Sequence, residues 1–228
     1  MNAIAELPAG ILHKRIGTAQ PIFNNSAMQI DGIWNSLFTD FSSVWVPGTA
    51  EGPHFNQSTD ATTDSDAHIT FGTFTGTPLH DPSNNIRAQW RFSIDDYTNV
   101  RIPIGFSGAT ASNNMGDDDP PGGVAMLQFS TARGDTNWQF HTRPIFGPET
   151  LIDSGIVPVA DAIYTIEIEV TTDFTRFILY DKDLTVLADK VSTTNLLDQV
   201  CQFFAGVRTL NATAKTISHY GGMQVGEA

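Results

Sequence analysis

Residues 162–189 constrain the fold of this chain most, because two segments of alternating residues flank a short polar turn there. In the first segment one face is apolar and the other polar. The apolar members are Tyr164, Ile166, Ile168 and Val170, and the polar members are Thr165, Glu167, Glu169 and Thr171. This period of two predicts a strand with one side on a core. The second segment, 175–180, has large side chains on both faces, which predicts a strand covered on both sides.

Similar short segments, separated by turn residues, follow one another along most of the chain. The 15 Phe and 4 Trp favour strands, and the 19 Gly and 12 Pro supply turns. No helical pattern alternates with the strands, so we expect an all-β antiparallel sandwich of about ten to twelve strands. Residues 21–228 are predicted to form a single β-sandwich domain.

The first twenty residues, 1–20, show no period and contain the adjacent basic pair Lys14 and Arg15. They are predicted to form an irregular N-terminal arm. Such an arm is either a disordered or edge-docked terminus or an anchor to a larger assembly, and both interpretations stay open here.

A formal charge of -13 repels phosphate backbones and anionic membrane surfaces, so we expect neither nucleic acid nor membrane as a partner. The single cysteine, Cys201, rules out an internal disulfide and is expected to be a buried, inert thiol. The charge suits the exterior of a particle, although a solvated acidic surface needs no function to explain it.

An ordered set of strand fragments carries a resemblance to a known fold. The fragments are Asn99-Val100-Arg101-Ile102, Ile104-Gly105-Phe106-Ser107, Gly123-Val124-Ala125 with Phe129, Asn137-Trp138-Gln139, Asp153-Ser154-Gly155-Ile156, Tyr164 to Ile168, Arg176 to Tyr180, and Met223-Gln224-Val225. Their order resembles concanavalin A-like lectin and glucanase jelly-roll domains, of the type found in structural proteins of tailed bacteriophages. The resemblance covers residues 88–225, and it departs from the pattern at Asp181-Lys182-Asp183, where the relatives have an Asp-Gly turn.

Catalytic residues are not predicted. Glucanases of this fold use two Glu with an Asp between them on one strand, whereas Ile168 stands between Glu167 and Glu169. We therefore expect these two Glu to be solvent-facing acids. The six His show no zinc-type spacing, and no nucleophile elbow or phosphate-binding loop is present.

The run Asp117, Asp118 and Asp119 is the candidate metal site, because clustered carboxylates suit calcium. Three consecutive Asp do not easily point at one ion, however, so the absence of any cofactor is the main expectation. The tripeptide Arg133-Gly134-Asp135 is predicted to form an ordinary turn.

Aromatic side chains on a sheet face are the candidate ligand contacts, because sugar-binding sandwiches grip pyranose rings through aromatic faces. The candidates are Trp90, Trp138, Tyr180 and Tyr220. A Trp in a sandwich is more often part of the core, which is the competing interpretation.

The resemblance implies a non-enzymatic virion structural protein, a decoration of the capsid exterior or a fibre or tail-tip adhesin. Its partners would be other virion proteins, and we expect a homo-oligomer. The alternative is a lectin-like module that binds a host surface glycan, and the third hypothesis is a polysaccharide-degrading enzyme of the same fold.

Overall fold

The structure, a computed structural model, describes residues 22–24, 27–29, 41–46, 54–71, 80–108, 115–120, 122–220 and 224–227. The predicted arm, residues 1–20 with Lys14 and Arg15, lies outside these ranges, so its role as an anchor stays a prediction. Among the described residues, no helix has the length and apolar character needed to cross a membrane.

Strands dominate the described part of the chain, and the 3₁₀ helix η1 (Pro82–Asn84) interrupts them. The strands are β1 (Ile22–Asn24), β2 (Ala27–Gln29), β3 (Phe41–Val46), β4 (His54–Thr59), β5 (Asp66–Phe71), β6 (Ile86–Ile94), β7 (Val100–Ser107), β8 (Val124–Ser130), β9 (Gln139–Arg143), β10 (Thr150–Asp153), β11 (Tyr164–Val170), β12 (Thr175–Tyr180), β13 (Val186–Ser192), β14 (Gln202–Thr209), β15 (Thr216–Tyr220) and β16 (Gln224–Glu227).

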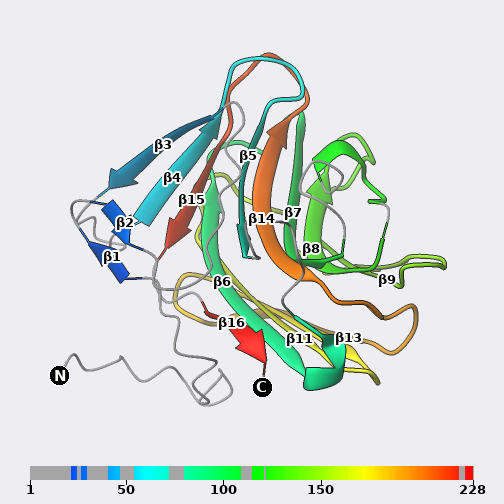
Figure 1. Cartoon of the computed structure of the whole chain (residues 1–228). Helices are drawn as coiled ribbons and strands as arrows, with labels where there is room; N and C mark the ends of the chain where they lie inside the picture. The colour runs from blue at the N-terminus through cyan, green and yellow to red at the C-terminus, as the bar shows by residue number, and fades with distance from the viewer. Residues whose placement is uncertain are drawn as a thin grey trace.

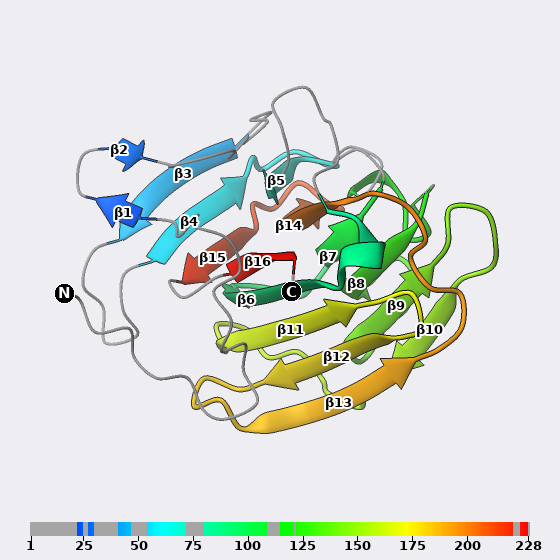
Figure 2. The same ribbon diagram turned by 60° about the horizontal axis from the view of Figure 1, so that its bottom comes forward.

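Strands β3 to β16 form two large antiparallel sheets that lie face to face, and β1 pairs with β2 in a separate two-stranded sheet (Figure 1). The six-stranded sheet has the order β10-β9-β8-β7-β14-β5. The eight-stranded sheet has the order β13-β12-β11-β6-β15-β4-β3, with β16 also paired to β6. Figure 2 shows this second sheet as a row from β3 to β13, with the strands of the first sheet behind it. The predicted all-β jelly-roll sandwich is confirmed.

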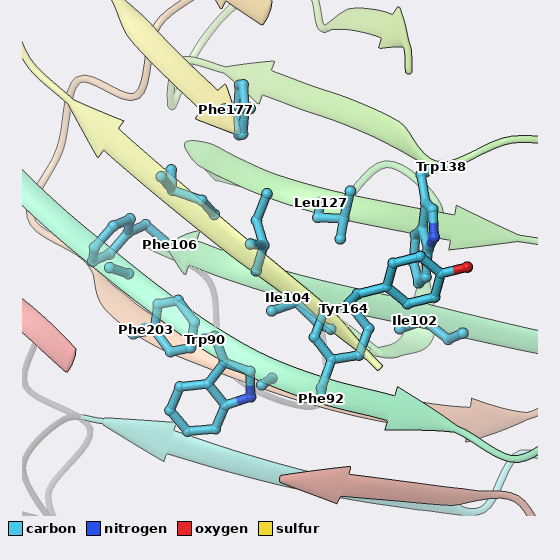
Figure 3. Packing of buried hydrophobic residues seen from close by; sticks show 14 of the residues in the cluster. Trp90, Phe92, Ile102, Ile104, Phe106, Leu127, Trp138, Tyr164, Phe177 and Phe203 are labelled. Atoms are coloured by element: carbon cyan, nitrogen blue, oxygen red, sulfur yellow. The ribbon is translucent and has the colours of Figure 1, made fainter. Parts of the chain in front are cut away.

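The core fills the space between the sheets with inward-facing residues from both of them (Figure 3). Trp90, Phe92 and Trp138 have no exposed surface, and aromatic edges meet aromatic faces through much of this layer. Cys201 is also fully buried, and burial raises the pKa of its thiol far above the ordinary value. The thiol is therefore protonated, as the sequence indicated.

Strands β11 and β12 form the predicted antiparallel pair, with Ile168 opposite Phe177. The next turn, from β12 into β13, forms without glycine because Asp181 accepts hydrogen bonds from the backbone N–H groups of Asp183 and Thr185, at 2.9 and 2.8 Å, while Leu184 adopts φ 61°. An aspartate that caps its own turn replaces the Asp-Gly pattern of the relatives.

Glu167 and Glu169 differ from the expectation of solvent-facing acids. Glu167 is only 7% exposed and accepts a hydrogen bond from the Tyr180 hydroxyl at 3.0 Å. Glu169 pairs with Arg87 on β6. Bulky residues on the outer face of the sheet cover the polar side of β11, so both acids belong to the packing of that face.

Candidate functional site

The outer face of the six-stranded sheet carries a dense set of polar side chains. Alternation along β8 places Leu127 and Phe129 in the core and Gln128 on the opposite face. The same alternation along β9 places Phe140 in the core and His141 on the outer face, beside β8. Both Gln128 and His141 have 0% exposure, so something covers this face as well.

Residues 115–120 lie over the outer face and provide part of this cover. Arg101 on β7 donates to the carbonyl oxygen of Met115 at 2.8 Å and to the carboxylate of Asp118 at 2.6 Å. The carbonyl of Asp118 in turn accepts from Gln128 Nε2 at 3.0 Å. Burial opposes ionisation of Asp118, but the hydrogen bond from Arg101 and the charges of Arg101 and Arg133 hold its pKa below the ordinary value. Asp118 therefore fastens the segment to the sheet.

The tautomer of His141 follows from its neighbours. Gln128 Oε1 accepts from Arg133 Nη1 at 2.8 Å, and an amide oxygen can only accept. His141 Nδ1, which lies 3.1 Å from the same oxygen, must therefore carry the proton and donate. Burial, followed by the charges of Arg133 and Arg143, lowers the pKa of His141 to about 3, so the ring is neutral and its Nε2 has a free lone pair.

The carboxylates of Asp119 and Glu149 lie close to this imidazole on its solvent side. His141 Nε2 lies 3.1 Å from Glu149 Oε2, without the alignment of a hydrogen bond. Arg143 Nη1 donates to Asp119 Oδ1 at 2.5 Å. The side chains of Asp119 and Glu149 are 51% and 37% exposed, so the group opens to solvent through them. Burial, and then the charge of Asp119, raise the pKa of Glu149.

We call these residues the His141 cluster, and it comprises Asp119, Gln128, Arg133, His141, Arg143 and Glu149. Chemically, the cluster combines guanidinium donors, a neutral imidazole and carboxylates that water and solutes can reach.

An exposed aromatic side chain stands next to the cluster, in the loop that joins β9 to β10. Phe146 is 89% exposed and lies between Arg143 and Glu149 in the chain. The loop is held by Arg143 Nε, which donates to the Gly147 carbonyl at 3.2 Å, and by the backbone N–H of Ile145, which donates to Asp198 at 2.8 Å. A large apolar ring presented to solvent by a fixed loop is a typical contact for a sugar or another apolar surface.

The aromatic residues chosen from the sequence are not brought together. Trp90 and Trp138 lie in the core with 0% exposure, so a ligand on either sheet cannot reach them. Tyr180 and Tyr220 lie on the outer face of the eight-stranded sheet, at 5% and 7% exposure. The hydroxyl of Tyr220 is 3.2 Å from Ser93 Oγ, while that of Tyr180 is bound to Glu167.

The three consecutive Asp are also separated by their contacts. Asp118 binds Arg101, Asp119 binds Arg143, and Asp117 accepts the backbone N–H of Asp119 at 3.2 Å. Each of the three carboxylates therefore has its own partner, and the run does not form one pocket of oxygens. Arg133 and Asp135 pair with each other across the predicted turn, at 2.6 Å.

The sequence analysis missed His141, Arg143, Glu149 and Phe146. One signal was present: Gln139, His141 and Arg143 alternate along one strand and therefore share a face. The contact of this face with Asp119 leaves no local pattern, because Asp119 and Arg143 lie 24 positions apart in the chain.

Comparison with known proteins identifies the fold and no family. No protein-family model matches the chain, and no curated protein matches it. A protein of unknown function from Shewanella oneidensis MR-1 has a similar structure, with a TM-score of 0.58, 12% identity and coverage of 96% of this chain and 95% of that one. The family 7 alginate lyase A1-II′, solved with a product, gives a TM-score of 0.53 at 11% identity, covering 79% and 82%. A Lotus tetragonolobus seed lectin gives 0.50 at 8% identity, covering 92% and 99%.

These likenesses confirm the jelly-roll part of the predicted resemblance. They contradict the prediction that the chain is not an enzyme, because several of the solved structures that share its fold are alginate lyases. A sandwich of this kind gives no ground for excluding catalysis, and the missing Glu-Asp-Glu strand motif concerns only one of the chemistries that the fold supports. We therefore withdraw that prediction.

Proposed function

We propose that this chain binds an acidic polysaccharide over the His141 cluster and cleaves it by elimination at a uronate residue. The observation that carries the proposal is the exposed Phe146 ring beside a cluster of guanidinium, imidazole and carboxylate groups that opens to solvent. The shared fold with alginate lyases supports it.

Binding would use two kinds of contact. The face of Phe146 offers an apolar platform for the C–H side of a pyranose ring. Arg143 offers a guanidinium whose Nη2 can donate to a sugar carboxylate. Its Nε donates to the Gly147 carbonyl and its Nη1 to Asp119 and to the Pro120 carbonyl, while the side chain is 20% exposed, so Nη2 is the nitrogen that would contact the sugar.

Elimination from a uronate requires positive charge at the sugar carboxylate and a proton acceptor near the carbon next to it. Arg143 would neutralise the carboxylate. Glu149, whose partly exposed carboxylate lies 3.1 Å from His141 Nε2, would accept the proton. The C–O bond to the leaving sugar then breaks, a double bond forms in the uronate ring, and the leaving sugar oxygen takes up a proton from water.

The test is to incubate purified protein with alginate, polygalacturonate and a neutral glucan, and to follow the ultraviolet absorbance of the unsaturated uronate. We expect product from at least one polyuronate and none from the neutral glucan. Arg143→Gln should lower the rate by about 100-fold, the usual effect of removing one donor to a developing charge. Arg176→Gln is the matched control, because Arg176 forms a similar pair with Asp189 on the other sheet. Absence of unsaturated product from every polyuronate contradicts the cleavage proposal.

A second candidate is glycan binding without cleavage. It is favoured by the pairing of each arginine on this face with a carboxylate, as in Arg101 with Asp118 and Arg208 with Asp66, which leaves little net positive charge. The fold shared with a seed lectin is compatible with it. Retention on a glycan array without product release would favour this candidate over cleavage.

The role as a virion structural protein, in a capsid or a tail, stays a prediction from the sequence, as do its virion partners and the homo-oligomer. Nothing in the fold or the comparisons concerns a particle. Labelling of the chain in particle images would test it.

A further inference from the structure

We propose that Asp119, His141 and Glu149 form a binding site for a divalent transition-metal cation, with Zn²⁺ as the preferred ion. Each residue offers one ligand atom, and these atoms lie within 4.8 Å of one another. The three residues come from different elements: Asp119 from the segment over the sheet, His141 from β9, and Glu149 from the end of the β9–β10 loop. The inference goes beyond the proposed function and does not depend on it.

The imidazole of His141 provides an observation independent of the acidic groups. Within the described ranges, Nε2 is buried and has no hydrogen-bond partner, while Nδ1 donates to Gln128. Nε2 therefore keeps an unshared lone pair, and Glu149 Oε2 lies 3.1 Å from this nitrogen without the alignment of a hydrogen bond. Two acceptors at this distance repel each other unless a proton or a cation stands between them. A cation removes this conflict and uses both atoms as ligands.

The spacing suits zinc. Ligand atoms at the usual 2.0–2.1 Å from a tetrahedral zinc lie about 3.3–3.4 Å apart. The 3.1 Å between His141 Nε2 and Glu149 Oε2 is close to this value before any adjustment. Asp119 uses Oδ1 for Arg143, and a carboxylate has a second oxygen with which it can bind a cation. Three protein ligands leave a fourth position for water or for an oxygen of a bound molecule.

The ligand set also distinguishes between metals. One neutral imidazole nitrogen with two carboxylates is a typical set for Zn²⁺, and similar sets bind Mn²⁺ or Fe²⁺. Calcium prefers six to eight oxygens, and only two of these residues supply oxygen. The predicted calcium run therefore contributes one residue, Asp119, to a site of different chemistry.

The hydrogen bond on the other ring nitrogen holds His141 in the tautomer that metal binding requires. Gln128 accepts the Nδ1–H and is itself fixed by Arg133 and by the carbonyl of Asp118. A partner of this kind on the second ring nitrogen is typical of metal-binding histidines. The guanidinium groups of Arg133 and Arg143 oppose the cation by charge, so we expect an affinity below that of a structural zinc finger.

Occupancy would have a consequence for catalysis, if the elimination proposal also holds. A cation bound to Glu149 withdraws the carboxylate that would accept the proton, so zinc would inhibit cleavage. Zinc binding and cleavage are measured separately, and either can fail without the other.

The experiment is calorimetric titration of Zn²⁺ into chelator-treated, untagged full-length protein, with Mn²⁺ and Ca²⁺ as separate titrants. We expect one zinc per chain, weaker manganese binding and no heat from calcium. Glu149→Gln and Asp119→Asn should each weaken zinc binding by about 10-fold or more. Glu149→His replaces one ligand by another and should retain binding. Asp173→Asn is the control, because Asp173 is an exposed carboxylate on the turn between β11 and β12.

Three results would overturn the inference. These are no zinc binding by the wild-type protein, binding that Glu149→Gln and Asp119→Asn leave unchanged, or calcium binding equal to that of zinc. Circular dichroism of each variant shows whether it keeps the β-sandwich, and Glu149→His separates loss of a ligand from loss of the fold.

Discussion

His219 in the core makes the stability of this sandwich depend on pH. The side chain has 0% exposure. Trp90 Nε1 lies 3.1 Å from His219 Nδ1, and an indole N–H can only donate. Nδ1 is therefore the acceptor and the proton is on Nε2, which donates to Gln57 Oε1 at 2.9 Å. Protonation would place a second N–H against the indole donor and bury a positive charge.

The size of the effect follows from the pKa. Burial lowers the pKa of His219 from 6.5 to about 3 in the folded chain. Because the folded-state pKa is depressed, the stability from a neutral His219 is fully present above the ordinary pKa. It is lost as the pH falls from about 6.5 toward about 3. At about 1.4 kcal/mol per pKa unit, the loss between about pH 7 and about pH 4 is about 3 kcal/mol.

His219→Gln isolates this loss, because glutamine keeps one acceptor for Trp90 and one donor for Gln57 but does not titrate. Urea unfolding followed by tryptophan fluorescence gives the free energy of unfolding of both proteins at the two pH values. The wild type should lose about 3 kcal/mol more than the variant on acidification. An equal loss in both proteins, within about 0.5 kcal/mol, would refute the argument that His219 must stay neutral.

Three further predictions concern single side chains. Phe146→Ala should weaken polyuronate binding by about 10-fold and change the free energy of unfolding by less than about 0.5 kcal/mol, because the ring is exposed. Equal binding in a pull-down titration contradicts the stacking role. Burial raises the pKa of Glu167 despite the hydrogen bond from Tyr180. Its raised folded-state pKa means that its contribution is present below the ordinary carboxyl pKa and lost as the pH rises through the raised value. Glu167→Gln should therefore raise the melting temperature at neutral pH. Thermal unfolding scans in which the variant gains more in melting temperature at acidic pH than at neutral pH would exclude this explanation. Gly206→Ala should cost about 1–3 kcal/mol, because a Cβ there would lie 2.7 Å from His68 Cβ and 3.0 Å from the Ala67 carbonyl. A variant as stable as the wild type in urea would show that the outer face can relax.

The sandwich could be predicted from the sequence because the pattern that indicates a strand is local. The alternation in residues 162–189 depends on neighbours two positions apart, so β11 and β12 could be predicted with their faces. The same alternation did not show that the outer face of β11 is covered. Glu167 was therefore expected in solvent, although Tyr180 and the packing around it leave 7% exposed.

The site was harder to predict because its contacts connect distant parts of the chain. Trp90 and Trp138 were candidate sugar contacts with a competing interpretation as core residues, and both lie fully buried between the two sheets. The run from Asp117 to Asp119 was a candidate calcium site, although three consecutive Asp do not easily point at one ion. In the structure Asp118 binds Arg101 and Asp119 binds Arg143. Phe146 gave no pattern, because one aromatic residue in a loop carries no period.

A crystal structure of the chain with a bound uronate oligosaccharide would show whether the glycan lies over the His141 cluster. We expect a sugar ring stacked on Phe146 with its carboxylate at Arg143. A sugar bound instead at Tyr180 and Tyr220, on the outer face of the eight-stranded sheet, would contradict it.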